Sequence, residues 1–319
     1  MVEELNCYVS DMTVLCGAEK LTVEEGKGKG TTLVRMYNGK WQLFLKADKC
    51  LDIFRADYKG DNICFITKNG LISNKLNNSV ALGFAGGFDA GFLYTCGLDN
   101  IGTPQSVNGK DCIQHGTISY IPAENVDIEK GFKGGEYFVS VSGDMKYTAL
   151  FGNKLILRRE ITLKYMSDDL IINDEIINES FSEDGYMLLY HFNLGYPQID
   201  ENATIKIDGI DKTLFVNDKA EKNYLNYTKL EKPKPENSEE VFCHVLKKGA
   251  VKAEVAGKYK LSIEFNSNQL PYLTQWKSMA CGDYALGIEP ATTILNNKET
   301  KKIQPFEKHS YDIRITVKG

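Results

Sequence analysis

Two histidines and one glutamate have the side chains and settings that could move protons. His191 lies in MLLYHFNLGYP, where a strongly apolar run delivers a His and an Asn and then turns at a glycine and a proline. Polar groups at the exit of such a strand either face a cavity or are satisfied locally. His115 lies in CIQHGTISY, between a glutamine and a glycine, and both interpretations are open for it as well.

Glu289 lies in DYALGIEPATTI, directly after an apolar run that predicts a strand and directly before a proline that ends it. An acid in this position is close to the boundary of the core. Burial raises the pKa of a carboxyl group toward the range in which it works as a base near neutral pH. The alternative is a glutamate at the edge of a strand that faces water.

Three other residues have simpler explanations. His244, in VFCHVL, is expected in the core or on a sheet face, and His309, in EKHSYD, is expected on the surface. Trp276 is one of two tryptophans and lies in LPYLTQWKSM. An indole packs well against the apolar C–H face of a sugar, although core packing is the commoner role of tryptophan.

Several classes of chemistry lack their sequence signatures. The chain has no HExxH or HxH pattern for a metal, no GxSxG for a serine hydrolase, and no GxxxxGK[ST] or GxGxxG for a nucleotide. The eight cysteines show no CxxC pair, so we expect them to be reduced and mostly buried. The two histidines and the glutamate suit proton transfer on a β scaffold, and we expect no metal and no cofactor.

The charge balance argues against large anionic partners. The chain has 319 residues with 38 Lys+Arg and 43 Asp+Glu, which gives a formal net charge of −5. Nucleic acids and anionic membrane surfaces bind clustered Lys and Arg, so neither is an expected partner. The start, MVEELNCYVS, lacks the apolar core of a secretory signal, and we expect a cytoplasmic location. The oligomeric state is open, and a homodimer is compatible with the sequence.

The elements that position these residues are predicted to be β-strands. Thr31–Tyr37 and Lys40–Lys46 flank Asn38-Gly39, and both arms are rich in aromatic and branched residues. Asn-Gly between such runs is a strong hairpin signal, because both residues tolerate the positive φ of a type I′ turn. Further strand-like runs follow at Glu136–Ser142, Lys154–Leu163, Leu170–Ile177, Thr204–Ile207, Val251–Phe265 and Tyr311–Val317.

Helical patterns are scarce, because no window of about 11–18 residues has convincing 3.6-residue apolar spacing. The one break in composition is Lys229–Glu240, KLEKPKPENSEE, which is either a linker between domains or an exposed excursion within one. Strands resume on both sides, which favours the excursion. The sequence predicts a single all-β, mainly antiparallel domain over residues 1–319.

Four segments in order resemble the aldose 1-epimerase-like proteins of the galactose mutarotase-like superfamily. The segments are GGFDAGFLYTCGLDNIGTP, QHGTISYIPAENV, YHFNLGYPQID and TQWKSMACGDYALGIEPAT, and the resemblance covers roughly residues 30–319. It implies a large β-sandwich of the supersandwich type, with a sugar site on the concave face of one sheet.

The resemblance also implies roles for the candidate residues. Glu289 would be a general base, His191 a general acid and His115 a second histidine that holds the sugar. Asn193 and Trp276 would line the pocket. The partner would be a small-molecule sugar.

The resemblance has two departures. Members of this branch often carry Asp-Arg-Gly-Met-Asp-Ile where this chain has DKCLDI, residues 48–53, and His-Gly-Arg where it has His115-Gly116-Thr117. The resemblance would place Lys49 and Asp52 among the substrate-binding residues. Loss of two arginines changes how a polyhydroxylated or anionic substrate would be held.

The implied activity is the interconversion of sugar anomers. Glu289 would take the proton of the anomeric hydroxyl while His191 supplies one to the ring oxygen, and we expect the two groups to bracket the sugar at roughly 5–8 Å. The alternatives are a carbohydrate-binding or sensor protein that has lost catalysis, and an isomerase or lyase that acts on a ketose or modified sugar.

Overall fold

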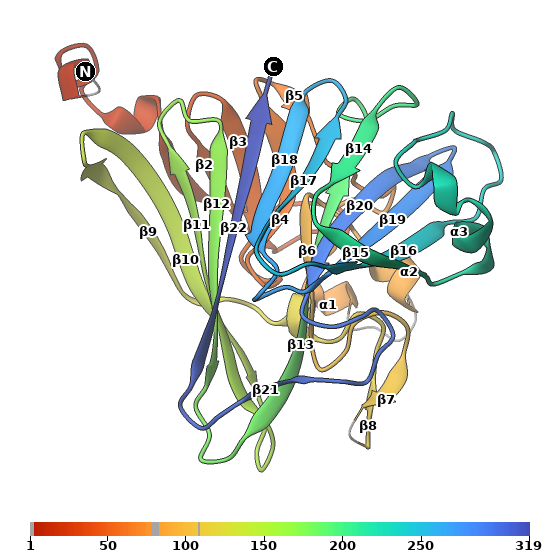
Figure 1. The fold of residues 1–319 in the computed structure, drawn as a ribbon. Coiled ribbons are helices and arrows are strands. Elements are labelled where there is room, and N and C mark those ends of the chain that lie inside the picture. Colours follow the sequence, from red (N-terminus) through yellow and green to blue (C-terminus); the bar gives the residue numbers. More distant parts are fainter. Residues whose placement is uncertain (1–2, 78–82, 108) are drawn as a thin grey trace.

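Antiparallel pairing between strands that follow one another in sequence builds the first sheet. The computed structural model describes residues 3–77, 83–107 and 109–319 (Figure 1). The first sheet has five strands in sequence order. They are β1 (Gly17–Thr22), β2 (Thr32–Tyr37), β3 (Trp41–Lys46), β4 (Asp52–Tyr58) and β5 (Asp61–Asn62).

The predicted hairpin at Asn38-Gly39 is confirmed, since it joins β2 to β3. Its turn is not type I′, because Gly39 has a positive φ of +92° while Asn38 does not. The Asn38 side chain accounts for this difference. Its Oδ1 accepts the backbone N–H groups of Lys40 at 3.0 Å and Trp41 at 2.7 Å, which closes the loop through the side chain.

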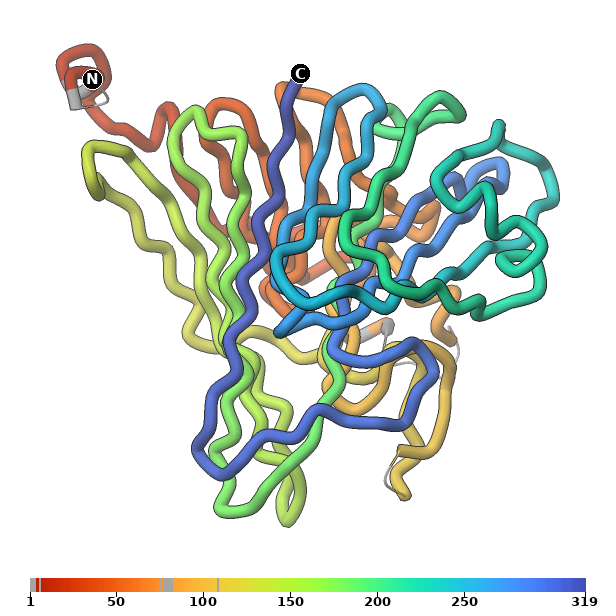
Figure 2. Tube along the Cα trace, in the orientation of Figure 1, coloured from red at the N-terminus to blue at the C-terminus, as the bar shows by residue number. Residues whose placement is uncertain are grey.

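A second sheet has eight strands, and the last strand of the chain lies in its middle. β22 (Lys308–Lys318) pairs with β18 (Lys260–Asn266) on one side and β12 (Asp169–Asn178) on the other, as Figure 2 shows. The sheet order is β14 (Thr204–Ile207), β17 (Ala250–Ala256), β18 (Lys260–Asn266), β22, β12 (Asp169–Asn178), β11 (Lys154–Lys164), β10 (Glu136–Thr148) and β9 (Glu124–Lys133). The run predicted as Val251–Phe265 is therefore two strands, β17 and β18.

A third sheet has seven strands and carries the candidate residues. Its order is β15 (Ile210–Phe215), β16 (Glu240–Leu246), β19 (Tyr272–Ala280), β20 (Asp283–Ala291), β13 (Asp184–Leu194) and β21 (Lys301–Ile303), and β6 (Leu93–Leu98) also pairs with β13. A small hairpin of β7 (Gln105–Val107) and β8 (Lys110–Cys112) lies apart from it. Residues 229–239 of the Lys229–Glu240 segment belong to the connection between β15 and β16, and Glu240 begins β16.

Helices are few and short, as the sequence indicates. They are α1 (Asn74–Asn77), α2 (Gly83–Gly87) and α3 (Asp218–Lys222), with 3₁₀ turns at Glu3–Cys7, Met12–Val14, Ile118–Tyr120 and Tyr224–Asn226. In the described ranges no helix has the length and apolar character needed to cross a bilayer. The prediction of an all-β, mainly antiparallel fold is confirmed.

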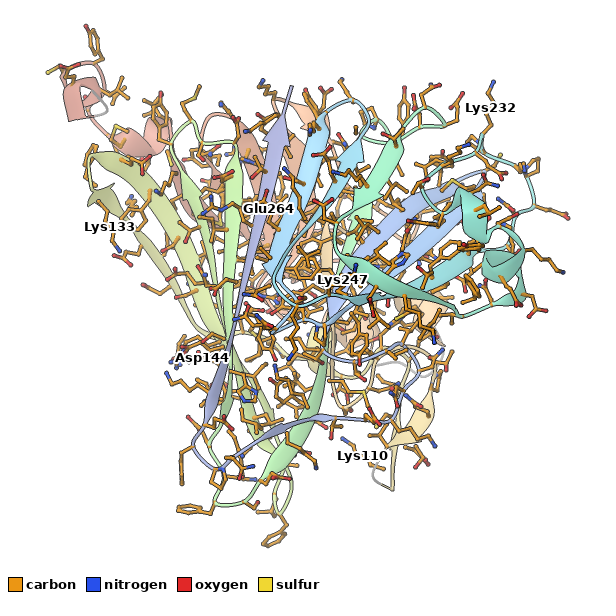
Figure 3. The ribbon with its side chains drawn as sticks, in the orientation of Figure 1. Lys110, Lys133, Asp144, Lys232, Lys247 and Glu264 are labelled. Carbon is orange, nitrogen blue, oxygen red and sulfur yellow. The ribbon has the colours of Figure 1, made fainter. Side chains whose placement is uncertain are left out.

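The period-two alternation of a strand decides which residues of the third sheet face the core. On β13, Tyr190 and Phe192 are fully buried in the large cluster that also takes side chains from the other two sheets. Residues at odd positions, including His191, point to the opposite face. Charged side chains such as Lys133 and Lys232 project from the outer surface (Figure 3).

Candidate active site

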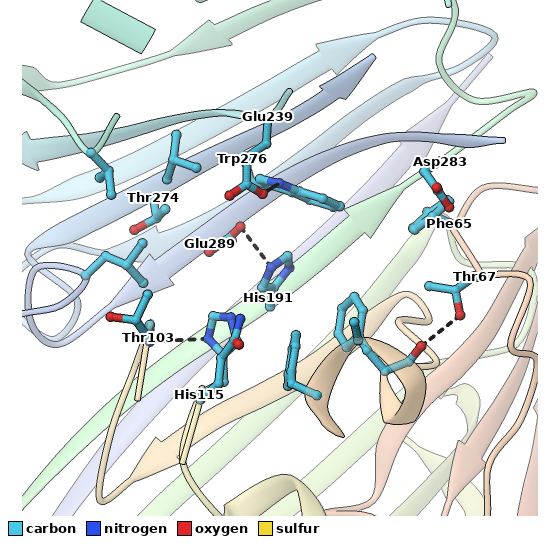
Figure 4. A pocket seen from close by; sticks show the side chains of 18 of the residues that line it. Phe65, Thr67, Thr103, His115, His191, Glu239, Thr274, Trp276, Asp283 and Glu289 are labelled. Carbon is cyan, nitrogen blue, oxygen red and sulfur yellow. Dashed lines mark hydrogen bonds and ion pairs between the residues drawn. The ribbon is translucent and has the colours of Figure 1, made fainter. Parts of the chain in front are cut away.

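A pocket of about 590 Å³ lies on the face of the seven-stranded sheet opposite the large core (Figure 4). Strands β13, β19 and β20 supply His191, Trp276 and Glu289 as its floor. Connecting segments form its walls, with Phe88 near α2 and His115 after β8. The structure therefore brings four of the residues expected at the site into one cavity.

The strand register places Glu289 directly opposite His191. β13 and β20 pair Phe192 with Ile288 and Leu189 with Ala291, so the residues between them are cross-strand neighbours. Glu289 Oε1 lies 3.2 Å from His191 Nε2. The expected separation of 5–8 Å is wrong, because it assumed groups on two sides of a sugar ring. The two oxygens that exchange protons are bonded to the same carbon, which neighbouring groups can serve together.

Burial determines the electrostatics of this pair. Glu289 is 2% exposed, and burial, with the nearby charge of Glu239, raises the pKa of its carboxyl group well above the usual range. His191 is 6% exposed, and burial, with the neighbouring His115, lowers its pKa well below 6.5. Within the described chain, Glu289 Oε1 and His191 Nδ1 have no hydrogen-bond partner. The contact of Glu289 Oε1 is with His191 Nε2, so the carboxyl group and the imidazole face each other on the pocket floor.

His115 is held by the backbone in a conformation that fixes its tautomer. Its φ is +59°, and its backbone exchanges hydrogen bonds with Gly97 and Gly102. The N–H of Gly102 also donates to His115 Nδ1 at 3.3 Å. Burial lowers the pKa of His115 to about 4, so the ring is neutral at pH 7 and its proton is on Nε2. His115 therefore presents an N–H donor, with its ring 5.9 Å from that of His191.

Trp276 on β19 places an aromatic ring beside the pair. Its ring centroid lies 5.7 Å from that of His191 and 6.4 Å from that of Phe65. Its Nε1 donates to Glu239 Oε2 at 2.8 Å. This bond fixes the indole at the edge of the pocket, where its face can pack against a sugar.

Gly287 and Thr274 are site residues that sequence reasoning missed. A Cβ at Gly287 would clash with Glu289 Oε1 and lie 3.2 Å from His191 Cε1, so glycine leaves room for the pair. Thr274 lies opposite Glu289 on β19, is 1% exposed, and has an Oγ1 without a partner among the described residues. A signal was present for Gly287, which lies two residues before Glu289 in the run predicted to be a strand. Thr274 lies two residues before Trp276 on β19, a strand that was not predicted from the sequence.

Glu239 was missed for a different reason. It belongs to Lys229–Glu240, the segment that its composition predicts to be exposed, and it is an exposed residue that lines the pocket. Its contact with Trp276 joins positions 37 residues apart. No local pattern in the sequence reports that contact.

The prediction that Asn193 lines the pocket is wrong. Asn193 is fully buried, and its Nδ2 donates to the carbonyl oxygens of Gly91 and His191, each at 3.0 Å. Its side chain is committed to the backbone around His191. Asn193 therefore holds the end of β13 and does not face the ligand.

The prediction that Lys49 and Asp52 bind substrate is also wrong. Lys49 Nζ and Lys46 Nζ lie 3.1 and 2.9 Å from Asp89, and all three side chains are fully buried. Asp52 Oδ1 lies 2.8 Å from Arg159 Nη1, again fully buried. Buried charges need partners of opposite sign, and these residues belong to two internal ion-pair clusters and do not line the pocket. Burial and the neighbouring Lys46 lower the pKa of Lys49 to about 8.

The two other histidines lie outside the pocket. His244 is fully buried and bonds to Thr213 at 2.9 Å and Gln275 at 3.2 Å, which confirms its structural role. His309 is less exposed than expected, with a side chain 18% accessible and a 2.7 Å hydrogen bond between its Nδ1 and Tyr186. Six of the eight cysteines are buried, and all eight are free thiols.

The comparisons with known proteins agree with this architecture. The chain belongs to the family DUF4432, a domain of unknown function, whose model matches residues 28–317. Its fold is that of the galactose mutarotase-like proteins. No curated protein matches the sequence.

Three solved structures illustrate the similarity. A proposed aldose 1-epimerase from Klebsiella pneumoniae has a TM-score of 0.88 and 22% identity, over 98% of this chain and 86% of that one. A galactose mutarotase-like protein from Clostridium acetobutylicum has a TM-score of 0.67 and 18% identity, over 96% and 99%. Galactose 1-epimerase from Lactobacillus acidophilus has a TM-score of 0.60 and 11% identity, over 95% and 99%. At these identities the likeness establishes the fold.

Proposed function

We propose that the protein is an aldose 1-epimerase-like enzyme that interconverts the anomers of a reducing sugar. The observation that carries this proposal is the apposition of Glu289 and His191, 3.2 Å apart at the floor of the pocket. A carboxyl group and an imidazole in contact can accept one proton and donate another in a single event. The similarity to aldose 1-epimerases supports the same reaction class.

Ring opening needs one proton to leave and one to arrive. Glu289 takes the proton of the anomeric hydroxyl, and the electrons of that O–H bond form the aldehyde C=O. The bond between the anomeric carbon and the ring oxygen breaks, and its electron pair takes a proton from His191. Rotation about the adjacent C–C bond followed by reclosure, with both transfers reversed, yields the other anomer.

The pair carries one proton throughout this cycle. Opening converts a carboxylate and an imidazolium into a carboxylic acid and a neutral imidazole, and closing restores them. In the empty pocket, burial favours the neutral form of each group, because it raises the pKa of Glu289 and lowers that of His191. Both states are available without exchange of protons with water.

Two further residues orient the sugar. His115 offers its Nε2–H to a sugar oxygen, since Nδ1 is occupied by the N–H of Gly102. Trp276 offers an aromatic face next to His191. Together they hold the anomeric carbon over the pair, and correct orientation is a large part of catalysis by proton transfer.

Exchange between anomers, measured by NMR on a panel of free sugars, tests the proposal. The enzyme is expected to exchange at least one sugar faster than the buffer-catalysed rate. Saturable sugar binding with no acceleration of exchange would instead identify a carbohydrate-binding or sensor protein. Formation of a new sugar skeleton or an unsaturated product would identify an isomerase or lyase.

A further inference from the structure

The charged groups around the pocket are mostly acidic. Glu239, Asp283 and Glu289 line it, whereas Lys68 is the single lysine or arginine among its described lining residues. When Glu289 and His191 share one proton, the pair has no net charge. The remaining charged groups of the described lining are then two carboxylates, Glu239 and Asp283, and one lysine, Lys68. A pocket with this balance attracts cations and repels phosphate or carboxylate groups.

Glu239 is fixed at the rim. Its Oε2 accepts the indole N–H of Trp276 at 2.8 Å. The next residue, Glu240, is 3% exposed and anchors the chain on the other side of the sheet through Lys277 at 3.1 Å and Lys219 at 3.3 Å. The Glu239 carboxylate is therefore presented beside an aromatic ring, a combination that suits a protonated amine.

The interior of the pocket is also rich in hydrogen-bond acceptors. Thr274 Oγ1 is buried and has no hydrogen-bond partner in the described part of the chain, and Glu289 Oε1 lies 3.2 Å from His191 Nε2. Asn69 donates its amide hydrogens to the carbonyl oxygens of Ala85 at 2.9 Å and Phe88 at 3.0 Å, which leaves its Oδ1 as an acceptor. An ammonium group brings three donors and no acceptor, and matches such a lining better than a hydroxyl group does.

We infer that the substrate is an amino sugar. This inference rests on the proposed function, in which the pocket holds a reducing sugar. The protonated primary amine of the sugar is held by Glu239 beside Trp276, Asp283 adds a second negative charge to the pocket lining, and the C–H face of the sugar packs on Trp276. Sugars that carry a phosphate or a carboxylate are disfavoured by the same two carboxylates.

Binding of an amino sugar changes the ionisation of Glu289, the proposed base. The charge of Glu239 contributes to the raised pKa of Glu289. A positive charge bound beside Glu239 acts in the opposite direction, because it stabilises a neighbouring carboxylate. The bound amine therefore favours ionised Glu289, the form that accepts the anomeric proton.

Binding of methyl glycosides tests the inference independently of catalysis, because they lack a free anomeric hydroxyl and cannot open. Calorimetry would compare methyl 2-amino-2-deoxyglucoside and its galactoside counterpart with the matching methyl glucoside and galactoside. We expect the amino compound of at least one pair to bind about fivefold to tenfold tighter at low salt. The difference should shrink as salt is added, because charges at a pocket rim are screened.

Variants that remove one carboxylate charge show which residue causes the preference for the amino glycoside. Glu239→Gln and Asp283→Asn should each reduce the ratio of the two dissociation constants toward one. Glu129→Gln removes an equal charge from the exposed strand β9 and should leave the ratio unchanged. A preference that survives in the double variant of Glu239 and Asp283 contradicts the assignment.

The outcomes separate this inference from the proposed function. Equal or weaker binding of both amino glycosides, or tighter binding of glucose 6-phosphate than of glucose, overturns the inference even if neutral sugars exchange anomers. Preferred binding of an amino glycoside by a protein that exchanges no sugar of the panel contradicts the proposed function and leaves the recognition of the amino group standing. Binding of no glycoside at all contradicts both.

Discussion

Glu289 and His191 are 98 positions apart in sequence, yet Glu289 Oε1 lies 3.2 Å from His191 Nε2 across adjacent antiparallel strands. The strands β13 and β20 fix this distance through their register. A slip of one residue would turn either side chain toward the core. The proposed acid and base are thus positioned by regular secondary structure, the most rigid support that a β protein offers.

The pH dependence of kcat/KM follows from the pKa directions of this pair. Activity requires one proton on the pair. At low pH His191 gains a second proton, and because its pKa is lowered, we expect the acid limb well below pH 6.5. At high pH the last proton leaves Glu289, and because its pKa is raised, we expect the alkaline limb well above pH 4.5. A rate profile of anomer exchange checks this, and an acid limb centred near 6.5 would contradict it.

Removal of the buried acid should stabilise the protein at neutral pH. Folded Glu289 keeps its proton at pH values where the unfolded chain has lost it, because its pKa is raised above 4.5. Its contribution to stability therefore falls as pH rises between the unfolded and folded pKa values. Glu289→Gln should unfold at a higher temperature than the parent at pH 7, and the two should converge below pH 4.5. Thermal melts at several pH values measure this, and a parent that is the more stable form at pH 7 would contradict it.

Gly287 should tolerate no side chain. A Cβ there would clash with Glu289 Oε1 and lie 3.1 Å from Trp276 Cβ. We expect Gly287→Ala to lower kcat by at least about tenfold through displacement of the catalytic pair, with a loss of roughly 1–3 kcal/mol in the free energy of unfolding, as for overpacking. Gly131→Ala in β9 is the matched control, since nothing lies within 4 Å of its added Cβ. Full activity in Gly287→Ala would show that the pair has more room than the structure indicates.

His115 should affect binding more than folding. His115→Asn keeps a residue that tolerates the positive φ of +59° but withdraws the ring from the pocket. We expect weaker sugar binding and a higher KM, with stability within about 1 kcal/mol of the parent. Calorimetric titration with a bound sugar and denaturant unfolding provide the two measurements. A large loss of stability with unchanged affinity would assign His115 a structural role.

The buried ion pairs of Asp89 should matter for stability. Asp89 contacts both Lys46 and Lys49 in the interior, at 2.9 and 3.1 Å. Asp89→Asn keeps the shape and removes the only negative charge of this trio, and loss of one partner from a buried ion pair costs about 3–5 kcal/mol. Urea unfolding would measure the loss. A variant as stable as the parent would show that groups other than Asp89 stabilise the buried charges of Lys46 and Lys49.

Local patterns predicted the parts of the fold that local physics controls. Asn38-Gly39 identified the β2–β3 hairpin because a tight turn needs particular residues. The apolar runs identified strands, and the polar residues beside them identified His191 and Glu289. Both residues lie inside their strands, because β13 continues to Leu194 and β20 continues through Pro290 to Ala291, where the sequence predicted an end at the proline. The register that brings these two side chains into contact is a property of the sheet, and no spacing in the sequence reports it.

The errors concern residues whose partners are distant in sequence. Lys49 and Asp52 lie in a motif that suggested substrate binding, but their charges are neutralised by Asp89 and Arg159 inside the protein. Glu239 lies in a segment of exposed composition and reaches the pocket through Trp276. In each case the role depends on a tertiary contact that only the folded chain defines.

In the proposed mechanism, Glu289 is the proton acceptor in anomer exchange. Glu289→Gln preserves the shape of the side chain and removes the base, and Glu129→Gln on β9 controls for the change of charge. With a sugar that the parent enzyme exchanges, NMR exchange rates should fall by at least about 10² in Glu289→Gln while its circular dichroism stays that of the parent. A folded Glu289→Gln variant that exchanges anomers at the parent rate would contradict the account.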